Sequence, residues 1–175
     1  KNDFANAIKV LEEARTLEPD NLDVIYQIGM LHEKKGDSQK ALAMMYDVLK
    51  KDPEFPSALN FIGYTYAEKG IRLEEAESMI RKALAKRPED GYIIDSLGWV
   101  FFKKGKLKAA LEEVQKASIL MPEDATIQEH LGDIYAALQD YAKAVHHYEK
   151  SVSLEKDPSK KNSVQQKLNM IKEKK

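Results

Sequence analysis

The sequence predicts an all-α protein in which a pair of helices is repeated along the chain. Segments that begin at Leu22, Pro56, Gly91 and Ala125 align with one another at a period of 34, 35 and then 34 residues. Each segment has a Gly at its eighth place (Gly29, Gly63, Gly98 and Gly132) and an Ala near its twentieth (Ala41, Ala76, Ala110 and Ala144). Self-similarity at a fixed period is the signature of a repeat architecture. We therefore expect residues 1–175 to form a single domain of stacked units.

Two helices are predicted within each unit. Apolar residues recur at i, i+3 and i+4, which is the spacing of an amphipathic helix. Gly36, Gly70 and Gly105 end the first helix, where a left-handed residue is favoured, and Gln139 takes this place in the last unit. A Pro stops the second helix of three units, at Pro53, Pro88 and Pro122. The small Gly and Ala side chains let the two helices approach closely.

One unit is longer than the others by a residue. In the stretch "YAEKGIRLEEA" the spacing from Gly63 to Ala76 is thirteen, whereas Gly29 and Ala41 are twelve apart. The stretch lacks the GxxxxGK spacing of a phosphate-binding loop. We interpret it as a lengthened turn, with Ile71 and Leu73 tucked over the helix ends.

The predicted unit boundaries are 22–55, 56–90, 91–124 and 125–158, preceded by a half repeat at 3–19. The half repeat consists of a second helix without its first helix, so its apolar face is expected to be exposed and to favour self-association. The pattern starts in the middle of a unit, which indicates a fragment of a longer protein. After the last unit, residues 159–172 are expected to form a helix with Ser159 as its N-cap.

Two interpretations of this last helix stay open. Val164, Leu168 and Ile171 form an apolar stripe at i, i+4 and i+7, which suits a capping helix that covers the last unit. The alternative is a basic amphipathic helix that binds an acidic surface, since the last twenty residues contain seven Lys.

The repeated pattern resembles the tetratricopeptide repeat family. The stretches "YQIGMLHEKKGDSQKA", "NFIGYTYAEKGIRLEEA", "DSLGWVFFKKGKLKAA" and "EHLGDIYAALQDYAKA" carry the resemblance, which covers about residues 3 to 158. The family's usual Trp at the fourth place is absent, and Ile25, Leu59, Ile94 and Gln128 stand there. The resemblance implies a right-handed α-solenoid of helix-turn-helix units.

No motif of the chain indicates catalysis, a metal site or a cofactor. His146 and His147 are adjacent, so their side chains point about 100° apart on a helix and do not share a face for one metal. The sequence contains no Cys, which excludes disulfides and thiolate metal sites. With 28 basic and 29 acidic side chains, the net charge gives no pull toward nucleic acid, and no apolar run is long enough to span a membrane. An enzyme is therefore not expected.

In this family the first helix of each unit lines the concave face, and its exposed places hold the ligand. Carried onto this sequence, these places are Tyr26, Gln27, Met30 and Glu33; Asn60, Phe61 and Tyr64; Tyr92, Asp95, Ser96, Trp99 and Phe102; and Glu129, His130 and Asp133. Tyr64, Tyr92, Trp99 and Phe102 are expected to form an aromatic strip that anchors a peptide. The alternative is that these rings pack against neighbouring helices.

The same places indicate what kind of partner binds. Some members of the family grip the acidic C-terminus of chaperones with Lys, Asn and Arg at these places. Here the corresponding residues are Tyr26, Met30, Asn60, Tyr64, Tyr92 and Ser96, of which only Asn60 is of a matching type. The resemblance therefore implies a partly apolar protein or peptide ligand and argues against such a carboxylate clamp.

Two functions follow from the resemblance. The first is a scaffold or adaptor that binds a partner in its concave groove, and the alternative is a self-assembling structural scaffold within a larger complex. A narrower similarity, over about residues 56–140, is to the C-terminal repeats of long bacterial tetratricopeptide proteins, several of them outer-membrane lipoproteins. It implies a periplasmic or outer-membrane-associated parent protein, and without it a cytoplasmic one; the sequence itself leaves the compartment open.

Overall fold

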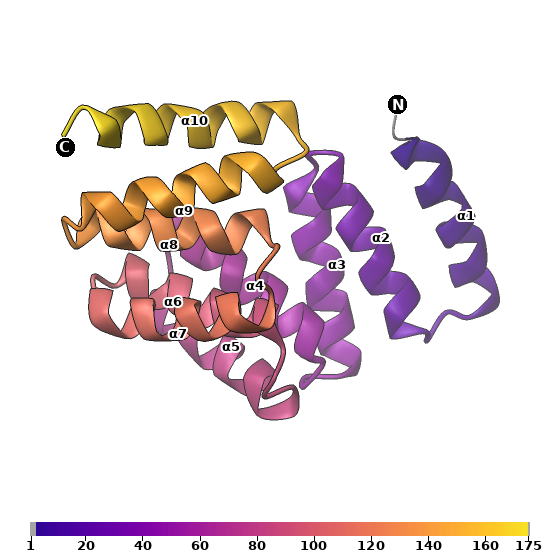
Figure 1. The fold of residues 1–175 in the computed structure, drawn as a ribbon. Helices are drawn as coiled ribbons and strands as arrows, with labels where there is room; N and C mark the ends of the chain where they lie inside the picture. Colours follow the sequence, from indigo (N-terminus) through magenta and orange to yellow (C-terminus); the bar gives the residue numbers. More distant parts are fainter. Residues whose placement is uncertain (1–2, 175) are drawn as a thin grey trace.

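The computed structural model describes residues 3–174, which form ten α-helices and no strand (Figure 1). The helices are α1 (Phe4–Leu17), α2 (Leu22–Lys34), α3 (Ser38–Lys51), α4 (Pro56–Lys69), α5 (Leu73–Lys86), α6 (Gly91–Lys103), α7 (Leu107–Leu120), α8 (Ala125–Ala137), α9 (Tyr141–Leu154) and α10 (Pro158–Lys172). The predicted all-α solenoid is confirmed. None of the helices within residues 3–174 combines the length and the apolar character that crossing a bilayer requires.

Neighbouring helices pack as the pairs α2–α3, α4–α5, α6–α7 and α8–α9, and each pair stacks on the next. The Gly at the eighth place makes this close packing feasible. A Cβ atom on Gly63 would lie 2.6 Å from Ile80 Cγ1 and 3.0 Å from the Ala76 carbonyl oxygen. The side chain that faces Gly63 is therefore that of Ile80, four residues after Ala76. Ala76 itself is fully buried.

The turns between the helices of a pair show where the extra residue lies. Gly36, Gly70 and Gly105 have φ values of 88°, 65° and 72°, and Gln139 adopts the same left-handed backbone with φ 62°. After Gly70 the chain adds Arg72, a second left-handed residue with φ 50°. Its guanidinium donates a 2.7 Å hydrogen bond to the Tyr66 hydroxyl, which fixes the lengthened turn.

Two local expectations for this turn and for the last helix are wrong. Ile71 is 46% exposed and does not cover the helix ends, whereas Leu73 is half-buried as expected. The N-cap of α10 is Asp157, whose carboxylate accepts from the backbone N–H groups of Ser159 and Lys160 at 2.9 and 3.0 Å. Ser159 lies inside the helix behind Pro158, which occupies the first helical position.

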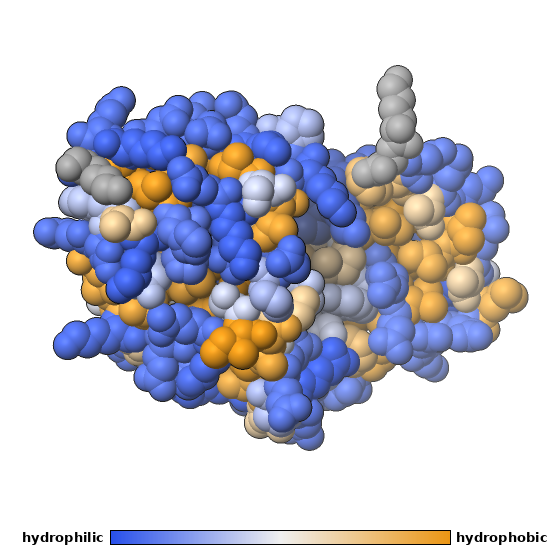
Figure 2. All heavy atoms as spheres, in the orientation of Figure 1, coloured by the Kyte–Doolittle hydropathy of each residue, from blue (hydrophilic) through white to orange (hydrophobic). Residues whose placement is uncertain are grey.

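The two ends of the solenoid differ in how their apolar faces are covered. Val164, Leu168 and Ile171 of α10 are buried and join the core cluster that runs through the stacked pairs, so α10 caps the last unit. At the other end, none of the residues of α1 is buried within Phe4–Leu17. Val10 and Leu17 are exposed, and Figure 2 shows an apolar surface over α1.

Candidate protein-binding groove

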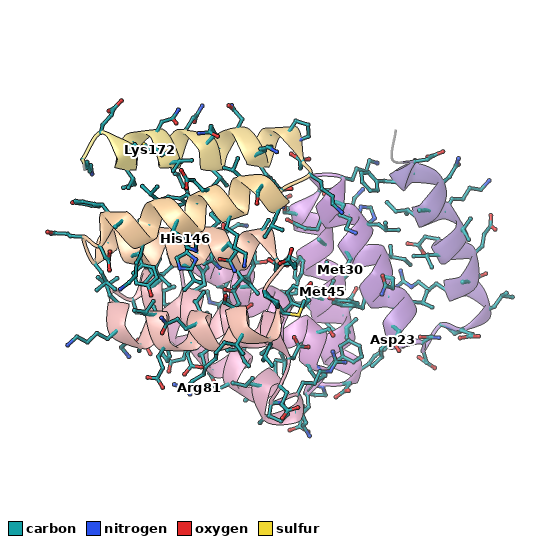
Figure 3. All side chains as sticks on the ribbon, in the orientation of Figure 1. Asp23, Met30, Met45, Arg81, His146 and Lys172 are labelled. Carbon is teal, nitrogen blue, oxygen red and sulfur yellow. The ribbon has the colours of Figure 1, made fainter. Side chains whose placement is uncertain are left out.

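A groove of about 760 Å³ crosses α2, α4 and α6 and reaches the N-terminal ends of α8 and α10. Met30 lies on the side of α2 that faces the centre of the molecule (Figure 3). The lining residues are Tyr26, Met30, Glu33, Ser38, Ser57, Asn60, Phe61, Tyr64, Thr65, Glu68, Lys69, Arg87, Asp90, Tyr92, Ile93, Asp95, Ser96, Asp124, Thr126 and Lys160. Most of them come from the first helices of three successive units, because the repeat places equivalent positions side by side.

Aromatic rings form much of the groove wall. Tyr26 packs against the ring of Phe55, with centroids 6.1 Å apart, and Phe61 and Tyr64 are half-buried beside it. Tyr92 stands at the far side of the groove and is 53% exposed. Burial raises the pKa of the Tyr26 and Tyr64 hydroxyls, so both stay protonated and able to donate a hydrogen bond at neutral pH.

The groove also has an unpaired hydrogen-bond acceptor. The Oδ1 atom of Asn60 is buried, and no donor in the described part of the chain reaches it. A buried acceptor without a partner costs about 1–3 kcal/mol, which a donor from a ligand would recover. Asn60 lines the groove, and rotation of its side chain would offer this acceptor to a ligand.

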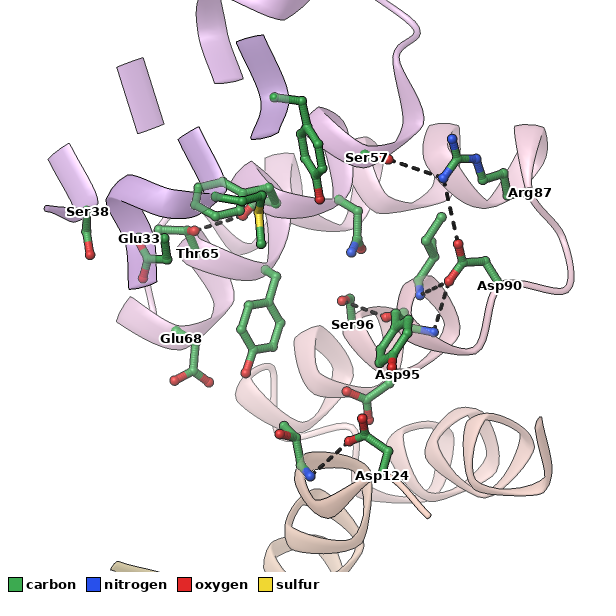
Figure 4. A pocket seen from close by; sticks show the side chains of 18 of the residues that line it. Glu33, Ser38, Ser57, Thr65, Glu68, Arg87, Asp90, Asp95, Ser96 and Asp124 are labelled. Carbon is green, nitrogen blue, oxygen red and sulfur yellow. Dashed lines mark hydrogen bonds and ion pairs between the residues drawn. The ribbon is translucent and has the colours of Figure 1, made fainter. Parts of the chain in front are cut away.

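Charged groups are distributed unevenly around the groove (Figure 4). Glu33 and Glu68 lie on one side, at the C-terminal ends of α2 and α4. On the other side, Arg87 donates to the Ser57 hydroxyl at 3.2 Å and lies 4.0 Å from the Asp90 carboxylate. Five acidic side chains line the groove (Glu33, Glu68, Asp90, Asp95 and Asp124), against three basic ones (Lys69, Arg87 and Lys160).

The expectation that Trp99 is exposed is wrong. It is 6% exposed and lies between two rings: His130, at a centroid distance of 4.0 Å, and Phe102, at 4.8 Å. Its indole N–H donates to the Glu68 carboxylate. The first helix of the next unit covers this place, so the packing alternative holds for Trp99 and for the half-buried Phe102.

Asp95 and His130 form a buried pair beneath the groove. The Nδ1 atom of His130 lies 3.0 and 2.9 Å from the two carboxylate oxygens of Asp95, and both side chains are almost inaccessible to solvent. Ser96, also buried, donates to the carbonyl of Tyr92 at 2.9 Å. Asp95 and Ser96 still contribute to the groove lining, whereas His130 does not.

Two of the predicted residues of the last unit, Glu129 and Asp133, form ion pairs with α10. The Lys167 ammonium lies 2.7 Å from both Glu129 Oε1 and Asp133 Oδ2, and the Tyr148 hydroxyl donates to Asp133 at 2.7 Å. Neither acid lines the groove, and the exposed Gln27 lies outside it as well. The structure therefore brings together nine residues of the predicted set, which are Tyr26, Met30, Glu33, Asn60, Phe61, Tyr64, Tyr92, Asp95 and Ser96.

Several lining residues were not predicted from the sequence. Arg87, Asp90 and Asp124 lie in the turns before α6 and α8, outside the first-helix places that the resemblance supplies. The sequence did hold a signal for the two acids, because Asp before a helical pattern is a typical N-cap. Lys160 enters from the first turn of α10.

Comparison with known proteins identifies the family. A family model described as tetratricopeptide repeat matches residues 57–160, and a second one with the same description matches residues 1–54. The chain belongs to the tetratricopeptide repeat family. Members of this family mediate protein–protein interactions and the assembly of complexes, and the repeat fold is a non-enzymatic interaction scaffold.

The chain matches only part of the length of each of two relatives. The chain is 33% identical over 127 residues to the TPR repeat-containing protein PA4667 of Pseudomonas aeruginosa, a match that covers 73% of the chain and 21% of the relative. It is 38% identical over 77 residues to the photosystem I assembly protein Ycf3 of Synechococcus elongatus, over 42% of the chain and 44% of that protein. The narrower resemblance to outer-membrane lipoproteins stays a prediction.

A solved structure shares the arrangement of helices. MamA from Desulfovibrio magneticus superposes with a TM-score of 0.66 at 25% sequence identity, over 87% of this chain and 86% of that one. The similarity extends over nearly the whole of both chains, which supports the same solenoid architecture for this protein.

Proposed function

We propose that the chain is a scaffold or adaptor that binds a peptide segment of a partner protein in the groove across α2, α4 and α6. The observation that carries this proposal is a concave surface lined by aromatic rings around a buried, unpaired acceptor, Asn60 Oδ1. Aromatic side chains in a pocket are frequent anchors of binding energy. The partner segment is partly apolar, since Tyr26, Met30, Phe61 and Tyr64 form the wall.

Asn60 supplies the polar contact in this proposal. In this proposal the Asn60 side chain turns toward the groove, and its carbonyl oxygen accepts an N–H group from the bound segment. Lysines that would bind a terminal carboxylate are sparse, because Lys69 and Lys160 lie at the rim and five acidic groups share the lining. An acidic chaperone tail is therefore a poor ligand for this groove.

Selection from a random peptide library displayed on phage tests the proposal. Peptides that bind the protein are labelled with fluorescein, and their affinity is measured by fluorescence anisotropy for the wild type, Tyr64→Ala and Asn60→Ala. We expect a loss of about tenfold or more for each variant, the effect of a residue worth about 1.4 kcal/mol or more. Tyr141→Ala is the matched control, since Tyr141 is a half-buried tyrosine on α9 that does not line the groove. Equal affinity of all four proteins would refute the groove as the binding site.

Self-association through α1 is the competing proposal. The exposed Val10 and Leu17 favour it, because contiguous apolar surface promotes association. Replacing both residues with Lys removes that surface and leaves the groove intact. Light scattering across a concentration series separates the two: a dimer that the double variant abolishes supports self-association, and a monomer at every concentration rejects it.

A further inference from the structure

A second hollow adjoins the groove at the turn between α7 and α8. Its volume is about 240 Å³, against 760 Å³ for the groove. It is lined by Tyr92, Leu120, Met121, Pro122, Glu123 and Asp124. Tyr92 and Asp124 line the groove as well, so the same tyrosine ring borders both spaces. These two shared residues place the second hollow next to the groove.

The absence of a side chain at Gly91 creates the close approach beside this hollow. A Cβ atom there would lie 2.6 Å from Met121 Cγ and 3.4 Å from Leu120 Cβ. Gly91 therefore lets the C-terminal end of α7 pack directly against the first turn of α6. Tyr92, the next residue, then stands out from that contact as one wall of the hollow.

The surface around the second hollow is apolar and exposed. Ile119 is 80% exposed and Leu120 46%, and Figure 2 shows an apolar patch over the C-terminal end of α7. A single exposed Leu carries no meaning on a protein surface. Here Leu120 lines the hollow and the adjacent Ile119 extends the apolar surface next to it, and such a patch marks an interaction surface.

The charged lining of the second hollow has one sign. Glu123 and Asp124 contribute carboxylates, and none of the residues of the described range that line it is basic. Asp124 also caps α8, since its Oδ1 atom accepts from the backbone N–H groups of Thr126 and Ile127 at 2.9 and 3.0 Å. A ligand that brings a cation next to an apolar group is complementary to this lining, and an acidic ligand is repelled.

We infer that this hollow is a second subsite of the groove, which accepts one apolar side chain flanked by a Lys or Arg from the bound peptide segment. The inference rests on the proposed function, because the same segment occupies both spaces. The volume suits a single side chain rather than a further stretch of chain. The specificity of the scaffold is then set by two separated features of its partner: an apolar segment for the groove and an apolar–basic pair for the subsite.

The phage-selected, fluorescein-labelled peptides test this inference through Leu120→Ser and Glu123→Lys. We expect Leu120→Ser to weaken the peptides about fivefold to tenfold and Glu123→Lys to weaken those with a Lys or Arg at the flanking position. Met170→Ser is the matched control, because Met170 is 58% exposed on α10 and lines neither hollow. Unchanged thermal midpoints show that the variants are folded.

A double-mutant cycle identifies the contact within the peptide. In a selected peptide, the apolar residue next to the flanking Lys or Arg is replaced with Ser. The affinity of this changed peptide is measured for the wild-type protein and for Leu120→Ser. We expect Leu120→Ser to cause little further loss of affinity for the changed peptide, since both substitutions remove the same contact. Full additivity, or wild-type affinity of Leu120→Ser, would overturn the subsite.

The two proposals fail in distinguishable ways. If Tyr64→Ala loses affinity while Leu120→Ser and Glu123→Lys do not, the groove stands and the subsite is rejected. If Leu120→Ser loses affinity while Tyr64→Ala does not, the peptide binds the hollow alone, which rejects both the groove and a shared segment. A library that yields no binding peptide rejects both proposals.

Discussion

Replacing Asp95 with Asn is expected to destabilise the protein most at acidic pH. The carboxylate of Asp95 lies 2.9 Å from His130 Nδ1, and both residues are buried between α6 and α8. Burial alone would lower the pKa of His130, but Asp95, together with Asp133 and Glu68, raises it above its usual value of 6.5. Trp99 stacks on the imidazole ring and Tyr64 packs near it, so the ring has no room to move toward water.

The sign of the pH dependence follows from that direction. Because the pKa of His130 is higher in the folded than in the unfolded protein, the stabilising effect is fully present below about pH 6.5 and is lost as the pH rises through the folded-state value. Asp95→Asn removes the carboxylate but leaves the His130 imidazole buried. The pKa of His130 therefore falls, and protonation of His130 then opposes folding. Removing one partner of a buried ion pair costs about 3–5 kcal/mol.

Urea denaturation at pH 5.5 and pH 8 measures this effect. We expect the free energy of unfolding of Asp95→Asn to fall by about 3–5 kcal/mol at pH 5.5. At pH 8 the loss is expected to be smaller, since the Asn amide can still hydrogen-bond to a neutral imidazole. Asp47→Asn is the control, because Asp47 pairs with the exposed Lys50 on α3 and is worth little at either pH. An equal loss at both pH values would refute this account of the pair.

Three further substitutions test the packing within a helix pair, the turn between the two helices of a pair, and the C-terminal capping helix α10. Gly98→Ala is expected to cost about 1–3 kcal/mol in urea denaturation, because the new Cβ would clash with Val114 Cγ2 and lie within 3.2 Å of the Val114 backbone nitrogen and the Ala110 carbonyl oxygen. An unchanged free energy of unfolding would show that α6 and α7 are less tightly packed than these distances indicate. Gln139→Gly is expected to stabilise by about 1 kcal/mol, because Gln139 holds a left-handed backbone; calorimetry that shows a lower melting temperature would contradict this. Leu168→Ala is expected to cost about 2–5 kcal/mol and to increase hydrogen exchange first in α9 and α10; exchange that rises equally in all helices would show that α10 is not a local cap.

The fold was largely predictable because the determinants of a repeat unit are local. Close contact within a pair needs a small residue at Gly63, and the end of a first helix needs a left-handed residue at Gly70; both appear in the sequence at fixed spacing. The start of α10 was assigned to the wrong residue because Ser159 and Asp157 are both good caps. Pro158 favours Asp157 as the cap, because its fixed φ and its missing N–H suit the first helical position.

The groove was predictable only where a first-helix place stays uncovered. Tyr26, Asn60 and Tyr64 are only partly buried and line the groove. Trp99 occupies an equivalent place, but His130 of the next unit stacks on its ring. Which side chain covers which depends on contacts between units about 35 residues apart, and the pattern of a single unit does not contain that information. The role of the turns, including Arg87, emerges only when the units are stacked.

The central claim is that the groove across α2, α4 and α6 holds the partner. Backbone amide chemical shifts of the isotope-labelled protein, recorded as a phage-selected peptide is added, test it most directly. We predict that the largest shifts fall on α2, α4 and the first turn of α6, around Tyr26, Asn60 and Tyr92, with little change in α3, α5 and α7 before Ile119. Shifts concentrated on α3 and α5, or on α1, would contradict the claim.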